Sequence, residues 1–223
     1  YPMSDSTAYS GTSGVYTALV TPRRPGTVNI DLGASLEIVD FLVQAKVNGL
    51  VAMGSTGEFT HFDSEERTRF ASMVIKRSRV PVLVNVTHSS LRGSILQAQA
   101  AIDAGAKGVV LMPPFFFRYQ QAAIREFFLR FTDEIQAPTY LYNSPFFTTP
   151  MDCETALELL NTGRFAGIKD SSGKFEYIKT LIDNRNPGQR LIVGNDTAYA
   201  PLRQVGADGV VSGCSCAIPE LLV

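Results

Sequence analysis

The sequence has few of the residues that build metal and redox sites. Its 223 residues include three cysteines and two histidines, His61 and His88. Three cysteines cannot all pair with one another, and Cys214-Ser215-Cys216 lacks the two-residue spacer of zinc and dithiol motifs. We therefore expect no metal and no cofactor, and we predict a reducing, cytoplasmic compartment.

An excess of one charge and long apolar runs are also missing. Lys and Arg number 20 and Asp and Glu number 21, so no broad positive field attracts nucleic acid or anionic lipid. No apolar run reaches the roughly 20 residues that cross a bilayer, and the N-terminal YPMSDSTAYSGTSG has no signal-peptide pattern. We expect a small-molecule partner, no nucleic acid, no membrane and no export. The chain starts at Tyr1 and stops in what resembles the opening of an apolar helix, so we also expect a trimmed or partial chain.

What the sequence does contain is a strict alternation of strand and helix patterns. Short, continuously apolar, β-branched runs are typical of strands buried on both faces, and amphipathic stretches of helical period separate them. We predict strands at 15–20, 49–53, 80–86, 108–112, 138–142, 165–169, 190–194 and 208–212. Helices are predicted at 36–47, 64–77, 91–104, 120–134, 152–161, 175–184 and 197–205. Eight strands at a spacing of roughly 25 to 30 residues indicate a single α/β domain over 1–223, a (β/α)8 TIM barrel rather than a doubly wound sheet.

Two local patterns agree with this arrangement. Asp63 followed by Glu66 is typical of a helix N-terminus with a capping box. The segment 105–110, GAKGVV, is repeated at 206–211 as GADGVV, and 47–51 is a looser copy. Each copy ends a helix and enters a strand, where glycine suits the left-handed cap.

Lys169 is the first candidate for chemistry, because reacting groups in such barrels gather at the carboxyl ends of the strands. It closes the run FAGIK, whose other residues are all apolar or glycine. Burial disfavours an ammonium relative to the neutral amine, and the neutral amine is the form that attacks a ketone to make a Schiff base. The alternative is a structural lysine that reaches solvent or pairs with Asp170.

Tyr142 closes the preceding strand and is the second candidate. Neighbouring strands lie about 4.8 Å apart, which puts its phenol within reach of Lys169 or of a substrate bound there. Such a phenol can carry protons. The alternative is a tyrosine that packs in the barrel layer with its hydroxyl on a backbone carbonyl.

A glycine-flanked turn, GSTGE at 54–58, follows the second predicted strand. The hydroxyls of Ser55 and Thr56 and the backbone N–H groups between the glycines suit a carboxylate. The turn is neither a dinucleotide fingerprint nor a P-loop, and we interpret Glu58 as a structural partner. Gly194, after the seventh strand, allows a ligand close to the backbone. The aromatic run 115–117 is interpreted as both a wall of the site and an interface patch.

Together these segments resemble the family of dihydrodipicolinate synthase and N-acetylneuraminate lyase, the pyruvate-dependent class I aldolases. The matching segments are ALVTP at 18–22, GSTGE at 54–58, YNSP at 142–145, GIKDSSG at 167–173, VGND at 193–196 and GADGVVSG at 206–213. The resemblance implies that Lys169 forms the Schiff base with pyruvate or another 2-oxo acid and that Tyr142 relays protons. It also implies that Ser55 and Thr56 hold the carboxylate, that Gly194 lines the pocket, and that the protein is a homodimer or homotetramer.

The sequence also departs from the family pattern. Dihydrodipicolinate synthases carry an arginine five positions after the catalytic tyrosine, where it binds the aldehyde's carboxylate, and Phe147 stands there in this chain. The family's second tyrosine, lent across a dimer interface, aligns with Phe115, so the proton relay needs water or another group. Family members are longer, with several helices after the eighth strand.

The sequence therefore predicts a lyase of the class I aldolase type. It would condense pyruvate with an aldehyde through an iminium and an enamine on Lys169, or cleave a 4-hydroxy-2-oxo acid by the reverse path. The phenylalanines predict an aldehyde less anionic than aspartate semialdehyde. One alternative is an N-acetylneuraminate lyase or a 2-keto-3-deoxy sugar acid aldolase or dehydratase. The alternative from another class is a catalytically silent barrel that binds a metabolite.

Overall fold

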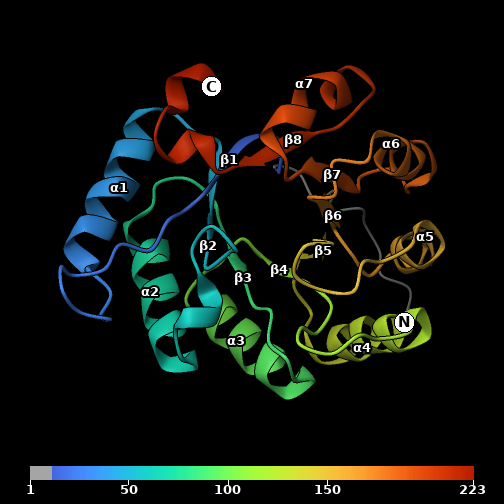
Figure 1. The fold of residues 1–223 in the computed structure, drawn as a ribbon, viewed down its shortest axis with the longest axis horizontal. Coiled ribbons are helices and arrows are strands. Elements are labelled where there is room, and N and C mark those ends of the chain that lie inside the picture. The colour runs from blue at the N-terminus through green and yellow to red at the C-terminus, as the bar shows by residue number, and fades with distance from the viewer. Residues whose placement is uncertain (1–11) are drawn as a thin grey trace.

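The computed structural model describes residues 12–223, which form a closed barrel of parallel strands surrounded by helices (Figure 1). Each strand pairs with the next, and β8 pairs with β1 to close the ring. The strands are β1 (Gly14–Ala18), β2 (Gly49–Ala52), β3 (Val82–Asn85), β4 (Gly108–Leu111), β5 (Thr139–Asn143), β6 (Gly167–Asp170), β7 (Arg190–Val193) and β8 (Gly209–Ser212). The predicted (β/α)8 barrel and all eight of its strands are confirmed.

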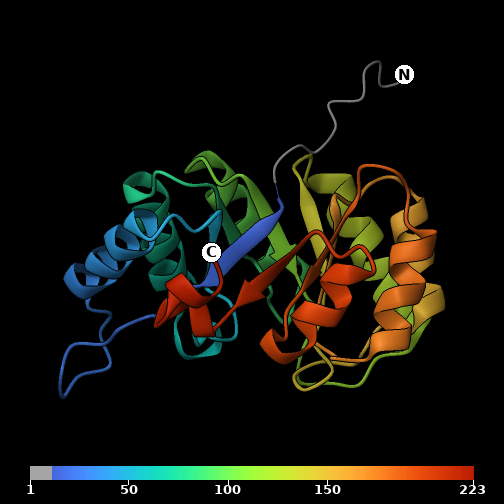
Figure 2. The same cartoon turned by 90° about the horizontal axis from the view of Figure 1, so that it is seen from above.

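Seven α-helices lie outside the barrel across the described residues. They are α1 (Leu32–Gln44), α2 (Ser64–Arg77), α3 (Leu91–Asp103), α4 (Gln121–Glu134), α5 (Cys153–Asn161), α6 (Phe175–Asn184) and α7 (Asp196–Gln204). The described residues also form three short 3-10 helices. One, η1 (Phe59–His61), lies between β2 and α2, and the other two, η2 (Cys214–Cys216) and η3 (Pro219–Leu221), come after β8. In Figure 1, η2 and η3 lie between α7 and α1, and Figure 2 shows the strands running between the two groups of helices.

Helix boundaries follow the capping chemistry. The predicted capping box of α2 is present, because Asp63 Oδ1 accepts from the Glu66 N–H at 2.8 Å and Glu66 Oε2 accepts from the Asp63 N–H at 3.2 Å. Helix α1 begins earlier than predicted, because the side chain of Asp31 accepts from the Ala34 N–H at 3.1 Å and caps the helix there.

The repeated helix-to-strand joint has the left-handed backbone that the sequence predicts. Gly105 has φ +98° and Gly206 has φ +108°. In the looser copy the corresponding position is Lys46, with φ +63°. Lys46, which has a Cβ, therefore adopts a left-handed conformation in which glycine is usually preferred.

Each even-numbered strand begins with a glycine, and neighbouring atoms occupy the space that a side chain at this glycine would need. A Cβ on Gly49 would lie 2.1 Å from Cε1 of Tyr16, and a Cβ on Gly167 would lie 1.9 Å from the carbonyl oxygen of Arg190. The N-terminal ends of β2 and β6 therefore leave no room for a side chain. This packing fixes how β6, which carries Lys169, lies against β7.

The described residues give three further findings that bear on function. None of their helices combines the length and apolar character needed to cross a membrane. No three His, Cys, Asp or Glu side chains of residues 12–223 gather closely enough to hold a metal ion. Cys153, Cys214 and Cys216 are all free thiols.

Candidate active site

Lys169 and Tyr142 lie side by side at the carboxyl ends of β6 and β5. The β5–β6 register pairs the two residues directly, so their side chains project to the same face of the sheet. Both are buried, with 5% of Lys169 and 2% of Tyr142 exposed. Nζ of Lys169 lies 3.7 Å from the centroid of the Tyr142 ring. The expected closeness of amine and phenol is therefore present, and Lys169 does not reach into bulk solvent.

Tyr142 is the point at which several polar groups meet. Its hydroxyl lies 3.3 Å from Oγ of Ser55, and Oγ of Ser171 donates to it at 3.4 Å. Burial by itself raises the pKa of the Tyr142 phenol, but the charge of Lys169 and hydrogen bonds from Ser171, Ser55 and Lys169 lower that pKa to about 7. Phenol and phenolate are then both populated near neutral pH, which is the property a proton carrier needs.

A buried hydrogen-bond network holds the strand ends just beyond these two residues. Asn143 Nδ2 donates to Asp170 Oδ2 at 2.7 Å, and Asn143 Oδ1 accepts from the Met151 N–H at 3.1 Å. The N–H and hydroxyl of Ser172 donate to Asp170 Oδ1 at 2.9 and 2.5 Å. Asp170 is thus bound by other groups and does not pair with Lys169, because successive residues of a strand point to opposite faces.

The turn after β2 presents Ser55 and Thr56 at the same end of the barrel. Ser55 is half-buried and Thr56 is exposed. Among the described residues, no protein group accepts from the backbone N–H of either residue. The turn is held by the Glu58 N–H donating to the Ser55 carbonyl at 3.0 Å and by Thr21 Oγ1 donating to the Gly57 carbonyl at 2.8 Å. A turn held in this way, with free N–H donors and hydroxyls beside them, suits an anionic group.

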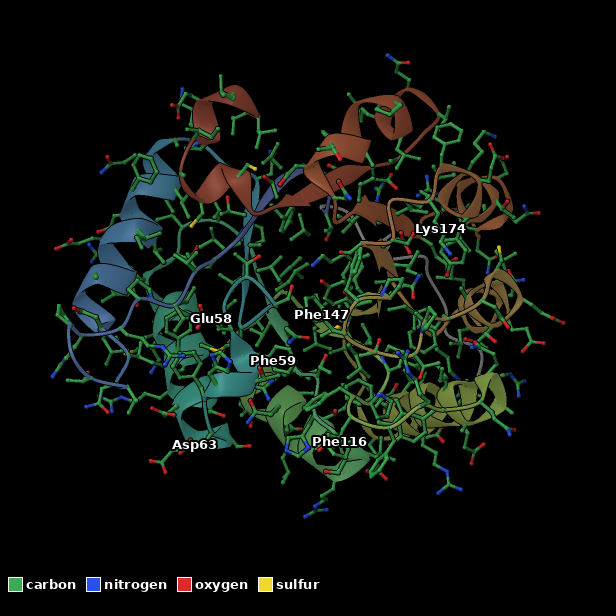
Figure 3. All side chains as sticks on the ribbon, in the orientation of Figure 1. Glu58, Phe59, Asp63, Phe116, Phe147 and Lys174 are labelled. Atoms are coloured by element: carbon green, nitrogen blue, oxygen red, sulfur yellow. The ribbon has the colours of Figure 1, made fainter. Side chains whose placement is uncertain are left out.

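Glu58 lies outside this group of donors and faces solvent. Its carboxylate pairs with Arg23 at 3.1 Å and with Nδ1 of His61 at 3.2 Å. Figure 3 shows Glu58 beside the short helix that begins at Phe59. These contacts agree with the interpretation of Glu58 as a structural partner.

Gly194 follows β7 and lies against Lys169. A Cβ at this position would lie 2.1 Å from Oγ of Ser171 and 3.0 Å from Cε of Lys169. The Gly194 N–H donates to the Asp170 carbonyl at 2.6 Å, and its own carbonyl accepts from Oγ of Ser171 at 3.3 Å. The space that a side chain would fill is therefore used by Ser171 and Lys169.

The phenylalanines near the site differ in exposure. Phe115 is half-buried and packs edge-on against Phe59, with ring centroids 5.8 Å apart. Phe116 is 86% exposed and Phe147 is 59% exposed. In Figure 3, Phe147 lies nearer the middle of the ring of helices and Phe116 nearer its edge.

Ser171 is the site residue that our sequence reasoning missed, together with the Asn143–Asp170 pair. A signal for Ser171 was available, because it stands two positions after Lys169 and so on the same side of an extended chain. For the pair, the signal was that Asn143 and Asp170 directly follow Tyr142 and Lys169 on adjacent strands.

Comparisons with known proteins show the family of the chain. The sequence profile of the Dihydrodipicolinate synthetase family matches residues 11–223. The 4-hydroxy-tetrahydrodipicolinate synthase of Salinibacter ruber is 34% identical over 210 residues, which are 92% of this chain and 69% of that protein.

Two solved structures of similar proteins extend the comparison to three dimensions. The 2-keto 3-deoxygluconate aldolase from Picrophilus torridus has a TM-score of 0.89 at 28% identity, covering 92% of this chain and 75% of its own. The dihydrodipicolinate synthase from Acinetobacter baumannii, complexed with pyruvate, has a TM-score of 0.90 at 28% identity, covering 94% and 73%. Because the family profile spans nearly all of the sequence and the barrel matches as well, this chain belongs to the dihydrodipicolinate synthetase family of lyases and aldolases.

Proposed function

We propose that the chain is a Schiff-base-forming lyase that condenses pyruvate with an aldehyde or cleaves a 4-hydroxy-2-oxo acid. The observation that carries this proposal is the buried amine of Lys169 lying 3.7 Å from the Tyr142 ring centroid at the carboxyl end of the barrel. Family membership and the pyruvate complex of the Acinetobacter relative support the same chemistry.

In the proposed reaction, the neutral amine of Lys169 attacks the ketone carbon of pyruvate to form a carbinolamine. The Tyr142 phenol gives its proton to the carbinolamine hydroxyl, water leaves, and an iminium remains. The phenolate then takes a proton from the methyl group, which yields an enamine and restores the phenol. The enamine carbon attacks the aldehyde carbon, and the phenol protonates the resulting alkoxide. Water then hydrolyses the iminium, which releases the product and the free amine, and the proton set free in this step restores the Tyr142 phenol.

Ser55 and Thr56 are proposed to hold the pyruvate carboxylate. Their backbone N–H groups have no protein acceptor among the described residues, and their hydroxyls lie in the same turn. N–H donors from consecutive residues bind a carboxylate through charge-assisted hydrogen bonds. This binding would bring the ketone towards Lys169, since Ser55 Oγ already lies 3.3 Å from the Tyr142 hydroxyl.

Borohydride reduction in the presence of pyruvate tests the nucleophile. We expect a covalent adduct on Lys169, mapped by peptide mass spectrometry, and no adduct in Lys169→Met. Lys174 offers a matched control, because it is exposed and stands only five residues further along (Figure 3). Lys174→Met should trap as the wild type does. If the wild type gives no adduct in saturating pyruvate, the catalytically silent barrel is favoured instead.

A second candidate differs only in the aldehyde. Phe147 is exposed where dihydrodipicolinate synthases carry an arginine, which favours a less anionic substrate such as a sugar-derived aldehyde. The structural similarity to a 2-keto 3-deoxygluconate aldolase supports this candidate. Assays with a panel of 2-oxo acids, acidic and hydroxylated, separate the two, because only the dihydrodipicolinate-type reaction requires aspartate semialdehyde.

We propose that the protein is a homodimer or homotetramer. The support is a pair of exposed aromatic rings, Phe116 and Phe117, which are 86% and 65% exposed and lie edge-on with centroids 4.8 Å apart; Phe146 is also 77% exposed. Exposed apolar clusters of this kind are typical of protein interfaces. Sedimentation of the wild type and of Phe116→Ser/Phe117→Ser tests the assembly, which the double substitution should weaken.

A further inference from the structure

Ser171 is the only residue of the site whose hydroxyl lies between Tyr142 and a backbone acceptor, among the hydrogen bonds of residues 12–223. Its Oγ lies 3.4 Å from the Tyr142 hydroxyl and 3.3 Å from the Gly194 carbonyl oxygen. These separations exceed the usual O–H···O distance of about 2.8 Å. Hydrogen bonds of this kind in unliganded sites commonly shorten when substrate binds.

The Ser171 hydroxyl cannot donate to Tyr142 and to the Gly194 carbonyl at the same time, because a serine hydroxyl carries one proton. The Gly194 carbonyl oxygen can only accept. A Tyr142 phenolate can also only accept. In the contact between Ser171 and Tyr142 the Ser171 Oγ is the donor, whereas a Tyr142 phenol can give its own proton to Oγ of Ser55. The proton of Ser171 therefore points to Tyr142 when tyrosine is ionised and to Gly194 when tyrosine is protonated. Rotation about one bond satisfies both states, and no proton leaves Ser171.

Ser55, the other hydroxyl at Tyr142, is less free to do this. It lies in the turn whose donors are proposed to hold the pyruvate carboxylate, so its proton is directed to substrate when the site is occupied. A hydroxyl that donates to a carboxylate can accept from the phenol but cannot donate to the phenolate. Ser171 remains available to the phenolate in the occupied site.

Gly194 supplies an independent observation. A Cβ at that position would lie 2.1 Å from Oγ of Ser171, a separation that no side chain tolerates. The absence of a side chain at 194 is thus required for the observed position of the Ser171 hydroxyl. The backbone holds Ser171 as well, because its N–H donates to the Asn143 carbonyl at 2.9 Å.

From this geometry we propose that Ser171 is a positioning residue for proton transfer. Its hydroxyl donates to Tyr142 when the tyrosine is ionised and to the Gly194 carbonyl when the tyrosine is protonated. The proposal rests on the proposed Schiff-base function and deepens it by naming the residue that positions the Tyr142 hydroxyl for proton transfer. Ser171 acts through Tyr142 and need not touch the substrate.

The test separates imine formation from proton transfer. Borohydride trapping with pyruvate measures the imine, and exchange of the pyruvate methyl protons with deuterium in heavy water, followed by NMR, measures enamine formation. We expect Ser171→Ala to trap pyruvate on Lys169 but to exchange about tenfold more slowly, less than the roughly 10²–10⁴-fold that a general acid–base group contributes, because Ser171 acts through Tyr142. In Ser171→Ala the acidic limb of the pH profile of exchange should move to higher pH. The Tyr142 phenolate loses a hydrogen-bond donor, and the pKa of the phenol therefore rises.

Ser171→Thr keeps a hydroxyl and should restore exchange to within about threefold of the wild type. Ser144→Ala is the matched control, because Ser144 is a buried serine of the same region whose Oγ has no hydrogen-bond partner among the described residues. It should exchange at the wild-type rate.

Each outcome has one meaning. Equal exchange and an unmoved pH limb in Ser171→Ala would overturn the proposal, and so would a Ser171→Thr variant as slow as Ser171→Ala. A wild type that fails to trap pyruvate would instead overturn the Schiff-base function itself. Ultraviolet titration of Tyr142 in the absence of substrate adds a check independent of activity, since its pKa should rise in Ser171→Ala and not in Ser144→Ala.

Discussion

Asn143 Nδ2 donates to Asp170 Oδ2 at 2.7 Å, one residue beyond the pair that the register aligns, Tyr142 and Lys169. Both partners are buried, at 2% and 0% exposed. The hydrogen bond therefore fixes the ends of β5 and β6 relative to each other, at the position where phenol and amine must stay in contact.

Removal of this hydrogen bond should weaken both stability and catalysis. We expect Asn143→Ala to lower the free energy of unfolding by about 1–3 kcal/mol, because it leaves one Asp170 oxygen without its partner in the interior. Urea denaturation measures this loss, and the rate of borohydride trapping should fall with it. Thr180→Ala, on the exposed face of α6, provides a control that should leave both quantities unchanged.

The Tyr142 phenol should titrate at a pKa of about 7, below the ordinary tyrosine value of 10.0. The protein has eight tyrosines, and ultraviolet difference absorption should show one phenolate forming at a pKa of about 7. Tyr142→Phe should remove this transition. In Lys169→Met the transition should move to higher pH, because burial continues to raise the pKa of the phenol and the lowering charge of Lys169 is gone. An unchanged transition in Lys169→Met would show that the amine does not govern the phenol.

The same ionisation predicts a pH dependence of stability. Between about 7 and 10.0 the unfolded chain holds a proton on residue 142 that the folded protein has released. The unfolded state thus binds more protons, so the free energy of unfolding rises with pH across this window. The contribution is fully present above 10.0 and is lost as pH falls through about 7. Denaturation at several pH values, with Tyr142→Phe for comparison, should show a smaller rise in the variant.

Gly167→Ala should be strongly destabilising, because the new Cβ would lie 1.9 Å from the Arg190 carbonyl oxygen and neither backbone can yield. We expect a loss of more than about 3 kcal/mol, or no folded protein. Gly163→Ala is the matched control, since its φ is +72° but nothing lies within 4 Å of the added Cβ. It should cost only the backbone strain of about 1–2 kcal/mol. Thermal melting of both variants compares these costs, and equal losses would contradict the packing argument.

Phe147→Arg should change aldehyde preference. A guanidinium at this exposed position can form a charge-assisted hydrogen bond to a carboxylate, which is worth about 1.5–3 kcal/mol. We expect kcat/KM for an acidic aldehyde to rise about tenfold relative to an uncharged one. Phe147→Gln tests size and polarity without charge and should give no such preference. Trapping of pyruvate alone should be unaffected in both variants.

The barrel and the two central site residues could be predicted from the sequence, because local signals carry them. Apolar β-branched runs, alternating helices and the repeated glycine joint indicate the strands, and Lys169 and Tyr142 each close such a run. Boundaries shifted where a side-chain cap decided them, as Asp31 does for α1. The organisation of 1–223 as one domain and the roles of the site residues stay predictions: catalysis by Lys169 and Tyr142, and substrate binding by Ser55, Thr56 and Gly194.

The network around Tyr142 could not be predicted, because it depends on contacts between distant parts of the chain. Ser55 and Tyr142 are 87 residues apart, and Ser171 and Gly194 are 23 apart. The absence of a side chain at residue 194 explains the position of Ser171 only when both strands are in place. Single-sequence patterns describe faces and periods, and they do not show which hydroxyl meets which.

The β8–β1 ladder joins residues 14–17 to residues 209–212, so the first and the last strands of the ring depend on each other. A nascent chain that has not yet released β8 from the ribosome exposes two unpaired strand edges, on β1 and on β7. Such edges are templates on which other chains can add strands and aggregate. Synthesis of the barrel therefore passes through an aggregation-prone interval, which ends only when β8 has been made and can pair with β1 and β7.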